Sequence, residues 1–505
     1  MDTEAADETQ ESRPPSGGTP DLQQVEAKTD AGITLMLLRH FLVLSMQIGA
    51  GIILARKLLP QDFGMFAIAT FFVSSAQLVV DLGLPTALLR EPRRLTQREL
   101  VAVFSAQMLL ALLFVGALSA FAGPLAGLYA DIPAHMRLVI IGASAGLILF
   151  PLRTIPALLL ERTMRYRAFV IPESLQGISQ ATTATVLALA NLRVWALVFS
   201  PIVASVVGLI ALFRIQPWRP RFSADLHPVR RFLQFAVFFQ GTSVVAVVQN
   251  AILPLYIARR LGTAAAGLIA WAAGRALKLQ EIVNIVGNVS MVGCARLQED
   301  PDALRTYFER NLRVCAFVVF PLATIASVLG EPILRIVYSD RWIPAIPLFR
   351  IYVLSLLPIT ALVLTVRLLA AIGRARLIFV MSTASAVLLW LLTVLLCERL
   401  GPLGAAIAFA ATNLLGATAY VLATRDILVP VAPRALVRPI LSCVPIAVGA
   451  LYMSRRIASI LDLLISVAIL LLVYAITLIV IGERPGKAWR VIVSEICSPS
   501  QSQAL

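Results

Sequence analysis

Positively charged side chains stand inside long apolar segments of this sequence, where an ion is costly. They are Arg39, Arg153, Arg275 and Lys278. If such a segment crosses a membrane, each buried charge costs about 2.5–3.5 kcal/mol, so it usually faces a cavity or a partner. The planar guanidinium of arginine stays charged and binds two phosphate oxygens at once. These residues therefore predict a cationic cavity suited to a phosphorylated group.

Polar and acidic residues accompany the cations in the same kind of segment. The amide candidates for the cavity are Gln47 and Gln249, and the carboxylate candidates for coupling to an ion or proton are Asp81, Glu173 and Glu281. Ser74, Gln77 and Asp81 follow an i, i+3, i+7 spacing, which places them on one helical face. A single polar stripe on an apolar helix indicates that this face turns toward water or toward another helix.

Each of these charges also has a purely structural interpretation. Arg39 lies about two turns from the predicted inner surface, so its side chain can extend to the lipid headgroups. Lys278 and Glu281 are three residues apart and can neutralise each other. Arg153 lies between two prolines and can bond carbonyls that proline kinks leave free, and Asp81 can pair with an arginine for structure alone. The sequence leaves both interpretations open.

The composition excludes a large soluble protein. The 505 residues are 59% hydrophobic and 14% charged, with a mean hydropathy of +0.86, whereas a soluble domain has about 25% charged residues. The net charge of +15 lies in short arginine clusters between apolar runs, which argues against a nucleic-acid partner. The five cysteines form no CxxC pair and no GxxxxGK[ST] loop occurs, so we expect no metal, no cofactor and no ATP site.

Apolar runs of membrane-spanning length recur along the chain and predict an all-α integral membrane protein with about 14 transmembrane helices. The expected spans are 33–55, 63–89, 99–121, 136–160, 168–190, 194–214, 231–257, 263–291, 313–334, 343–368, 376–397, 403–424, 436–453 and 458–481. With a cytoplasmic N-terminus, the inner loops hold 25 arginines and lysines and the outer loops 11. This asymmetry favours a cytoplasmic location of both termini.

A short repeat indicates an internal duplication. Residues 55–58 (Ala-Arg-Lys-Leu) followed by Gly64 recur as 258–261 (Ala-Arg-Arg-Leu) followed by Gly267, an offset of 203, and a second pair of span openings lies at an offset of 209. Chance matches in a biased sequence are the alternative. A duplication predicts two six-helix lobes of the same topology, related by an axis along the membrane normal, plus two extra C-terminal helices. The expected domains are a disordered cytoplasmic tail (1–30), an N-terminal lobe (31–215), a cytoplasmic linker (216–230), a C-terminal lobe (231–425), helices 13 and 14 (426–481) and a cytoplasmic tail (482–505).

Five segments carry a family resemblance. They are 53–66 (Ile-Leu-Ala-Arg-Lys-Leu-Leu-Pro-Gln-Asp-Phe-Gly-Met-Phe), 81–91, 161–167, 194–197 and 341–348. They resemble the loops of Wzx-type oligosaccharide/polysaccharide flippases, the polysaccharide transporter branch of the multidrug/oligosaccharidyl-lipid/polysaccharide exporter superfamily. The resemblance implies that superfamily's two-lobed fold in a bacterial inner membrane. It also implies the flipping of undecaprenyl-pyrophosphate-linked glycan across the lipid bilayer for exopolysaccharide or lipopolysaccharide biosynthesis, with polysaccharide polymerase and export machinery as further candidate partners.

We therefore expect a transporter and not an enzyme. Our hypothesis is alternating access, in which Arg39 and Arg275, with Arg153 or Lys278, hold the pyrophosphate and first sugar while the prenyl tail stays in lipid. The first alternative is a multidrug/cation antiporter of the same fold, which would need an acidic cavity. The second is a membrane polysaccharide ligase or polymerase, which would need a sizeable outer catalytic loop, and the largest outer loop expected here has about 14 residues.

Overall fold

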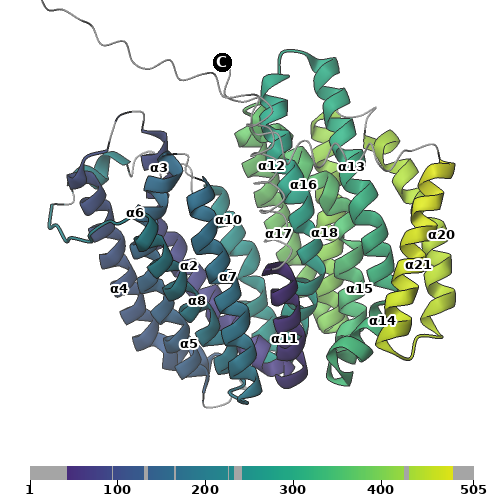
Figure 1. The fold of residues 1–505 in the computed structure, drawn as a ribbon, viewed down its shortest axis with the longest axis horizontal. Helices are drawn as coiled ribbons and strands as arrows, with labels where there is room; N and C mark the ends of the chain where they lie inside the picture. The colour runs from purple at the N-terminus through teal and green to yellow at the C-terminus, as the bar shows by residue number, and fades with distance from the viewer. Residues whose placement is uncertain are drawn as a thin grey trace, which may run out of the picture. The chain divides into compact units, whose positions relative to one another are not determined.

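The structure, a computed structural model, describes residues 43–91, 93, 95–129, 135–163, 166–225, 227–232, 241–425 and 432–481. Arg39 and both predicted tails lie outside these ranges. Within them, all regular secondary structure is helical (Figure 1). Each of the fourteen predicted spans overlaps a described helix, so the predicted all-helical membrane fold is confirmed.

The helices before residue 216 pack together, and we call them the N-terminal lobe (43–215). They are a helix over 43–57, α2 (Pro60–Asp81), α3 (Leu84–Arg90), α4 (Gln97–Gly127), α5 (Met136–Ser144), the 3₁₀ turn η1 (Ala145–Ile148), α6 (Leu149–Arg162), α7 (Tyr166–Leu189) and α8 (Val194–Ile215). Within this lobe, α7 packs against α8, and α4 packs against α5 and α6. Buried apolar side chains such as Phe104 and Ile155 fill the space between these helices.

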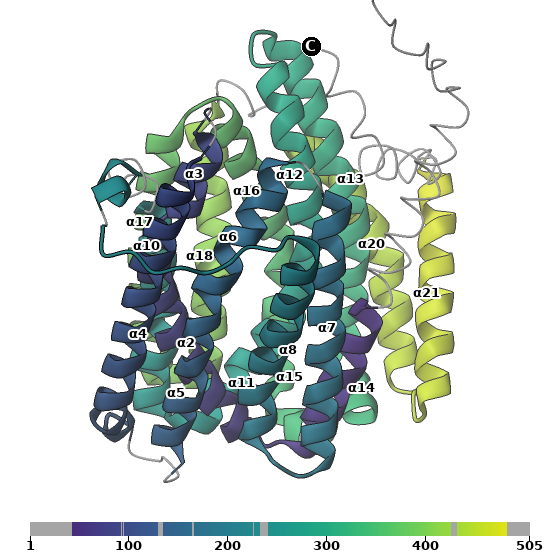
Figure 2. The ribbon, with the colours of Figure 1, turned by 60° about the vertical axis from the view of Figure 1, so that its left-hand side comes forward.

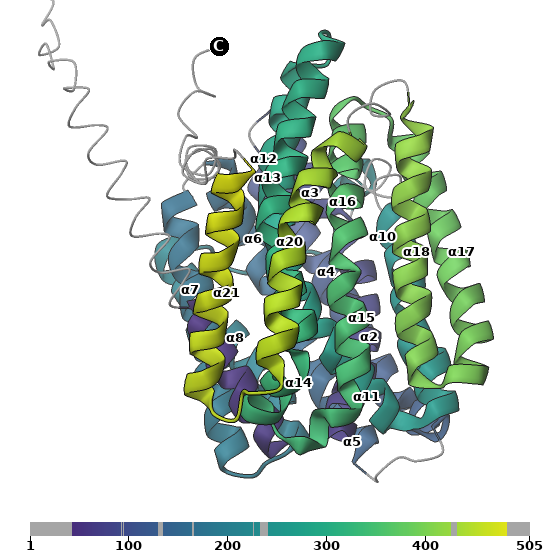
Figure 3. The same cartoon turned by 90° about the vertical axis from the view of Figure 1, so that its right-hand side faces the viewer.

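The helices of residues 241–425 form a second group, which we call the C-terminal lobe. They are α10 (Gly241–Asn250), the π-helical turn η2 (Leu253–Ile257), α11 (Ala258–Ala276), η3 (Leu277–Leu279), α12 (Gln280–Arg296), α13 (Pro301–Val328), α14 (Gly330–Ile333), the π-helical turn η4 (Leu334–Tyr338), η5 (Asp340–Ala345), α15 (Ile346–Leu354), α16 (Leu356–Ala371), α17 (Ala375–Leu400) and α18 (Pro402–Ala423). Two further helices, α20 (Ala432–Ser454) and α21 (Ile460–Val480), follow it. α20 packs on α13, and α21 packs on α20 (Figure 3).

Eleven helical stretches of the described residues are long and apolar enough to cross a membrane. One of them, Gly241–Arg296, is 56 residues long and contains a kink at Gly262, where φ is 86° and ψ is 164°. Two of the predicted spans share this stretch. The eleven stretches do not include the predicted spans 33–55 and 168–190. These two spans overlap the helix over 43–57 and the 24-residue α7, respectively. The chain is therefore a multi-pass membrane protein.

Some helices extend well beyond the predicted spans. α13 begins at Pro301, whereas apolarity alone placed the start of this span at residue 313. The carboxylate of Asp300 caps its first turn by accepting hydrogen bonds from two backbone N–H groups, at 3.0 and 3.1 Å. The predicted boundary was wrong because hydropathy locates only the apolar part of a helix, whereas the cap decides where the helix begins. Figure 2 shows α12 and α13 extending past their neighbours.

α2 and α11 cross at two glycines that hold equivalent positions in the repeated motif. A Cβ atom on Gly64 would lie 1.9 Å from the carbonyl oxygen of Thr263, and one on Gly267 would lie 1.8 Å from that of Pro60. Gly64 and Gly267, like Pro60 and Thr263, are one repeat offset of 203 residues apart. Small residues let helix backbones approach closely within a membrane. The contact is reciprocal, as a two-fold relation between the lobes requires, and it supports the duplication.

Two of the segments with the family resemblance contact each other across the lobes. The indole Nε1–H of Trp342 donates a hydrogen bond to the carbonyl of Ala55 at 2.9 Å. Its ring meets that of Phe63 edge to face, with 5.3 Å between the centroids. The Arg56 guanidinium donates to two carbonyls at the end of η4, at 2.7 and 2.8 Å. These motif residues thus join the two lobes beside the α2–α11 crossing.

The linker between the lobes packs on α4 of the N-terminal lobe. Trp218 is buried there, with its ring edge to face with Phe104 at 5.3 Å. Farther along, the backbone N–H of Ser223 donates to the Ser105 hydroxyl at 2.9 Å. Together these contacts hold 216–225 against one lobe.

Removing the Asp225 carboxylate should loosen this linker. Arg98, and then the backbone N–H of His227, hydrogen-bond the carboxylate and hold its pKa below the usual value. The contact therefore contributes fully above the ordinary aspartate pKa of about 4, and its contribution is lost as the pH falls through the lowered pKa. We expect Asp225→Ala to raise amide hydrogen exchange across 221–225 at neutral pH, measured by mass spectrometry. Unchanged exchange would contradict a role for this contact.

Candidate functional site

A cavity of about 500 Å³ lies between the two lobes, within the roughly 300–1,000 Å³ range of small-molecule sites. The N-terminal lobe contributes the helix over 43–57, α2, α7 and α8, and the C-terminal lobe contributes α11 and η3. Its polar lining residues are Gln47, Thr70, Gln180, Ser200, Arg275 and Lys278. We call it the cationic cavity, because the described residues that line it include two cations and no aspartate or glutamate.

Arg275 is the cation most closely fitted into this cavity. It lies at the end of α11, where the helix continues through η3 into α12. Its guanidinium lies 5.8 Å from the ring centroid of Trp271 and interacts with the Tyr338 hydroxyl. A Cβ atom on Gly51 would come within 3.1 Å of it, so the absence of a side chain at this position makes room for the arginine. No carboxylate of the described residues forms an ion pair with Arg275, and its charge is available to an anion.

Lys278 lines the same cavity but has a local partner. Its Nζ lies 2.7 Å from an oxygen of Glu281, three residues along the chain, and both side chains are about half exposed. The structure therefore places these two residues as an ion pair at the edge of the cavity. Gln47 faces α7, where a Cβ atom on Gly177 would lie 3.4 Å from its amide nitrogen.

Arg153 lies in a different pocket, of about 280 Å³, which Asp81 also lines. One guanidinium nitrogen donates to the Gln176 side chain at 2.6 Å, and another lies 3.6 Å from Glu173. The polar stripe of α7 therefore holds Arg153 within the N-terminal lobe. The structure brings together Gln47, Arg275 and Lys278 and does not bring Arg153 to them. Arg39 lies outside the described residues.

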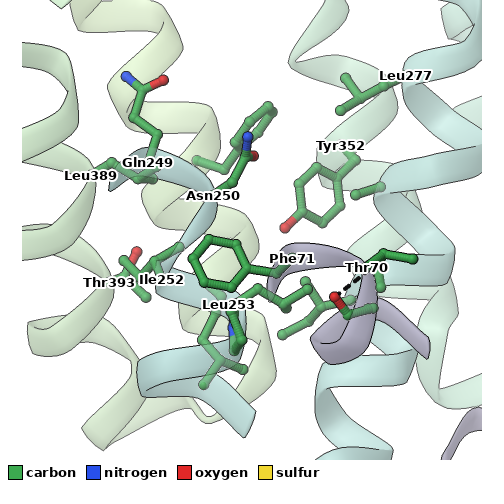
Figure 4. A pocket seen from close by; sticks show the side chains of 18 of the residues that line it. Thr70, Phe71, Gln249, Asn250, Ile252, Leu253, Leu277, Tyr352, Leu389 and Thr393 are labelled. Carbon is green, nitrogen blue, oxygen red and sulfur yellow. Dashed lines mark hydrogen bonds between the residues drawn. The ribbon is translucent and has the colours of Figure 1, made fainter. Parts of the chain in front are cut away.

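Gln249 lines a further cavity, of about 490 Å³. Its amide nitrogen donates to the carbonyl of Ser382 on α17 at 3.5 Å. Figure 4 shows Gln249 beside Leu389, across the cavity from Tyr352. The two amides predicted for one site thus belong to two adjoining cavities.

Trp271 is a lining residue that the sequence analysis missed. It is buried, and its ring stacks on that of Trp342 with 4.3 Å between centroids. Its indole N–H is buried and has no hydrogen-bond partner within the described part of the chain. The available signal was the i, i+4 spacing to Arg275, which places both on one face of α11.

The sequence of residues 53–347 matches the family model described as "Polysaccharide biosynthesis protein". The succinoglycan biosynthesis transport protein ExoT of Rhizobium meliloti (strain 1021) is 26% identical over 333 residues, which cover 65% of this chain and 66% of that protein. The lipopolysaccharide biosynthesis protein WzxC of Escherichia coli (strain K12) is 20% identical over 333 residues, which cover 64% of this chain and 66% of that protein. The chain thus spans slightly less than two thirds of the length of these curated relatives.

The fold is similar to that of the lipid II flippase MurJ in an inward closed conformation. The TM-score is 0.68 at 15% identity, and the match covers 88% of this chain and 98% of that one. At this identity the likeness shows the fold alone. None of these three proteins is described as a ligase or polymerase, so the enzyme alternative has no support among them. Because the family model matches more than half of the chain, the protein belongs to the polysaccharide biosynthesis protein family, whose Wzx-type members its loops resemble.

Proposed function

We propose that this protein moves a polyprenyl-pyrophosphate-linked oligosaccharide across the bacterial inner membrane by alternating access, for exopolysaccharide or lipopolysaccharide assembly. The observation that supports this most is Arg275, an arginine that faces the cavity between the lobes without a carboxylate partner among the described residues. Its fork can hold two oxygens of a pyrophosphate. The names of the two curated relatives support the same substrate class.

The rest of the cationic cavity suits the first sugar of such a substrate. Gln47 and Gln180 each offer an amide that both donates and accepts hydrogen bonds, as sugar hydroxyls require. The buried ring of Trp271 forms part of the wall beside Arg275. Lys278, paired with Glu281, adds a screened charge at the edge of the cavity. In this proposal Arg275 binds the pyrophosphate, and the amides orient the sugar.

Alternating access would use the α2–α11 crossing as part of its outer closure. α2 begins at the crossing, and α2 and α3 together run from Pro60 to Arg90. The arginine cluster of the loop that follows α3 therefore lies at the end of the lobe opposite to the crossing. With both termini in the cytoplasm, the crossing and the Trp342–Ala55 hydrogen bond lie toward the outer side. The described state would then be closed outside, and rocking of the lobes would break the outer contacts.

The carboxylates offer two places for coupling to an ion or proton. Glu173 faces Arg153 and Glu281 faces Lys278, so protonation of either acid would release its cation. Asp81 lines the pocket of Arg153 and belongs to the same proposed coupling site. Arg153 then acts in coupling and not in binding of the substrate.

The antiporter alternative finds less support in the cavity. A cationic drug would need an acidic lining, whereas the charged side chains among the described lining residues are Arg275 and Lys278. The charge of the cavity therefore favours an anionic substrate.

A reconstituted flipping assay tests the proposal directly. The purified protein is placed in vesicles of phosphatidylethanolamine and phosphatidylglycerol with a polyprenyl-pyrophosphate oligosaccharide that has a fluorophore on the sugar. Without protein, about half of the fluorescence should resist a membrane-impermeant quencher, because that half faces the lumen. With protein, nearly all of it should be quenched. An unchanged protected fraction, or transport of ethidium instead, would overturn the proposal.

A further inference from the structure

The cavity that contains Gln249 adjoins the cationic cavity. Ala67, Thr70 and Ala270 line both. We call the second one the apolar cavity, because most of its lining is aliphatic or aromatic. Its walls are α10, η2, α11, η3, α15, α17 and α18 of the C-terminal lobe, with α2 from the N-terminal lobe. Figure 4 shows Phe71 of α2 in the middle of it, between Leu253 and Tyr352.

The two cavities are lined by residues at corresponding positions of the two repeats. Their lining residues correspond at the two offsets found in the sequence, with 203 residues between the early helices of each lobe and 209 between the later ones. The corresponding pairs are Gln47 and Asn250, Gly51 and Pro254, Leu54 and Ile257 at the first offset, and Gln180 and Leu389, Ala184 and Thr393, Ser200 and Phe409 at the second.

The chemistry of the two copies has diverged. Where the cationic cavity has Gln180 and Ser200, the apolar cavity has Leu389 and Phe409. The opposite lobe also contributes differently, since Arg275 faces the first cavity and Phe71 faces the second. The first cavity, with two cations, therefore suits a charged group. The second has polar side chains such as Gln249, Asn250 and Thr393 but no charged residue in its described lining, so it suits a largely apolar group.

A thin wall separates the apolar cavity from the lipid-facing surface. α10 and α17 form this wall, and they also expose large apolar side chains, with Val248 47% and Leu391 55% exposed. The pair is joined by the indole of Trp390, which donates to the Val248 carbonyl at 2.8 Å. A hydrocarbon chain in a cavity of this size would gain dispersion contacts with the apolar part of its lining. A chain from the bilayer needs to pass only between these two helices.

We propose that the apolar cavity binds the first isoprene units of the prenyl chain whose pyrophosphate lies at Arg275. This inference rests on the proposed function, and it refines the expectation that the whole tail stays in lipid. One amphipathic molecule would then occupy both copies of the duplicated cavity, its head in one and the start of its tail in the other. Such a site selects a branched prenyl lipid over phospholipids, because an acyl chain lacks the methyl branches that fill a wide cavity.

Photo-crosslinking of the full chain in the same vesicles tests this site. The probes are a polyprenyl pyrophosphate without sugar that has a diazirine on an early isoprene unit, and a phosphatidylglycerol with a diazirine in its acyl chain. We expect the prenyl probe to label residues of 249–257 and 389–409, and Thr393→Phe to lower this labelling at least fivefold. Ala273→Leu, which fills the cavity from the opposite wall, should do the same. Leu391→Phe, two residues away on the lipid-facing side of α17, should not.

The possible outcomes separate this inference from the proposed function. Flipping by the wild type with prenyl labelling only outside the apolar cavity would overturn the inference and leave the proposed function standing. Equal labelling of the cavity by the phosphatidylglycerol probe would overturn selectivity for a prenyl chain. The absence of both flipping and prenyl labelling would overturn both proposals. Selective prenyl labelling that both cavity-filling variants abolish supports the inference.

Discussion

Arg275→Glu should abolish polysaccharide export while the protein still accumulates in the membrane. The substitution replaces a cavity cation that has no acidic partner among the described residues with an anion that repels pyrophosphate. Loss of one member of a desolvated charge pair costs about 2–5 kcal/mol, so we expect affinity for the substrate to fall by at least roughly 30-fold. Arg275→Lys should retain part of the activity, because a lysine supplies the charge but not the two-pronged hydrogen bonding. Export in a deletion strain and flipping in vesicles measure the effect.

The control for this prediction is the same charge reversal at an arginine that faces away from the cavity. Arg310 is exposed on α13 and is absent from the cavity lining, so Arg310→Glu should export normally. Lys278→Gln should have an intermediate, smaller effect than Arg275→Glu, since Glu281 already screens that lysine. Full export from Arg275→Glu at normal protein levels would refute the assignment of this residue to the substrate.

The fold could be predicted from the sequence because its signals are local. A run of about 20 apolar residues indicates a span whatever surrounds it, and all fourteen predicted spans overlap helices. The repeat around Gly64 and Gly267 was also visible as a pattern. The contact between the two glycines was not, because a duplication does not specify which faces of the copies meet. The bond from Trp342 to Ala55 joins residues 287 apart, and no local signal reports it.

The site could be predicted only in part, for a similar reason. The pairing of Lys278 with Glu281 is a contact within one helical turn, so their spacing indicated it. Arg153 and Arg275 look alike in the sequence, since each is a cation within an apolar span. They differ because Glu173, on another helix, neutralises the first, whereas the second has no acidic partner among the described residues. Helix packing decides which of the two arginines has an acidic partner, and the periodicity of the sequence does not indicate it.

Gly267→Ala should destabilise the protein more than a single added methyl group usually does. The new Cβ would lie 1.8 Å from the Pro60 carbonyl oxygen, and neither helix backbone can rotate away as a side chain does. Overpacking costs about 1–3 kcal/mol in ordinary cores, and we expect the upper end of that range here. Gly64→Ala, at 1.9 Å from the Thr263 oxygen, should behave alike. Thermal unfolding in detergent should show a lower Tm for both variants.

The matched control is Gly274→Ala on the same helix, where nothing lies within 4 Å of the added Cβ. Alanine is favoured over glycine within a helix by about 0.5–1 kcal/mol, so this variant should be as stable as the wild type or more so. The double variant Gly64→Ala, Gly267→Ala tests whether the contact between the two helices is rigid or can adapt. If one methyl already forces α2 and α11 apart, the second should add little, and the two effects should fall well short of additivity. An unchanged Tm in either single variant would show that the lobes part without cost at this crossing, and the outer closure for alternating access would have to lie elsewhere.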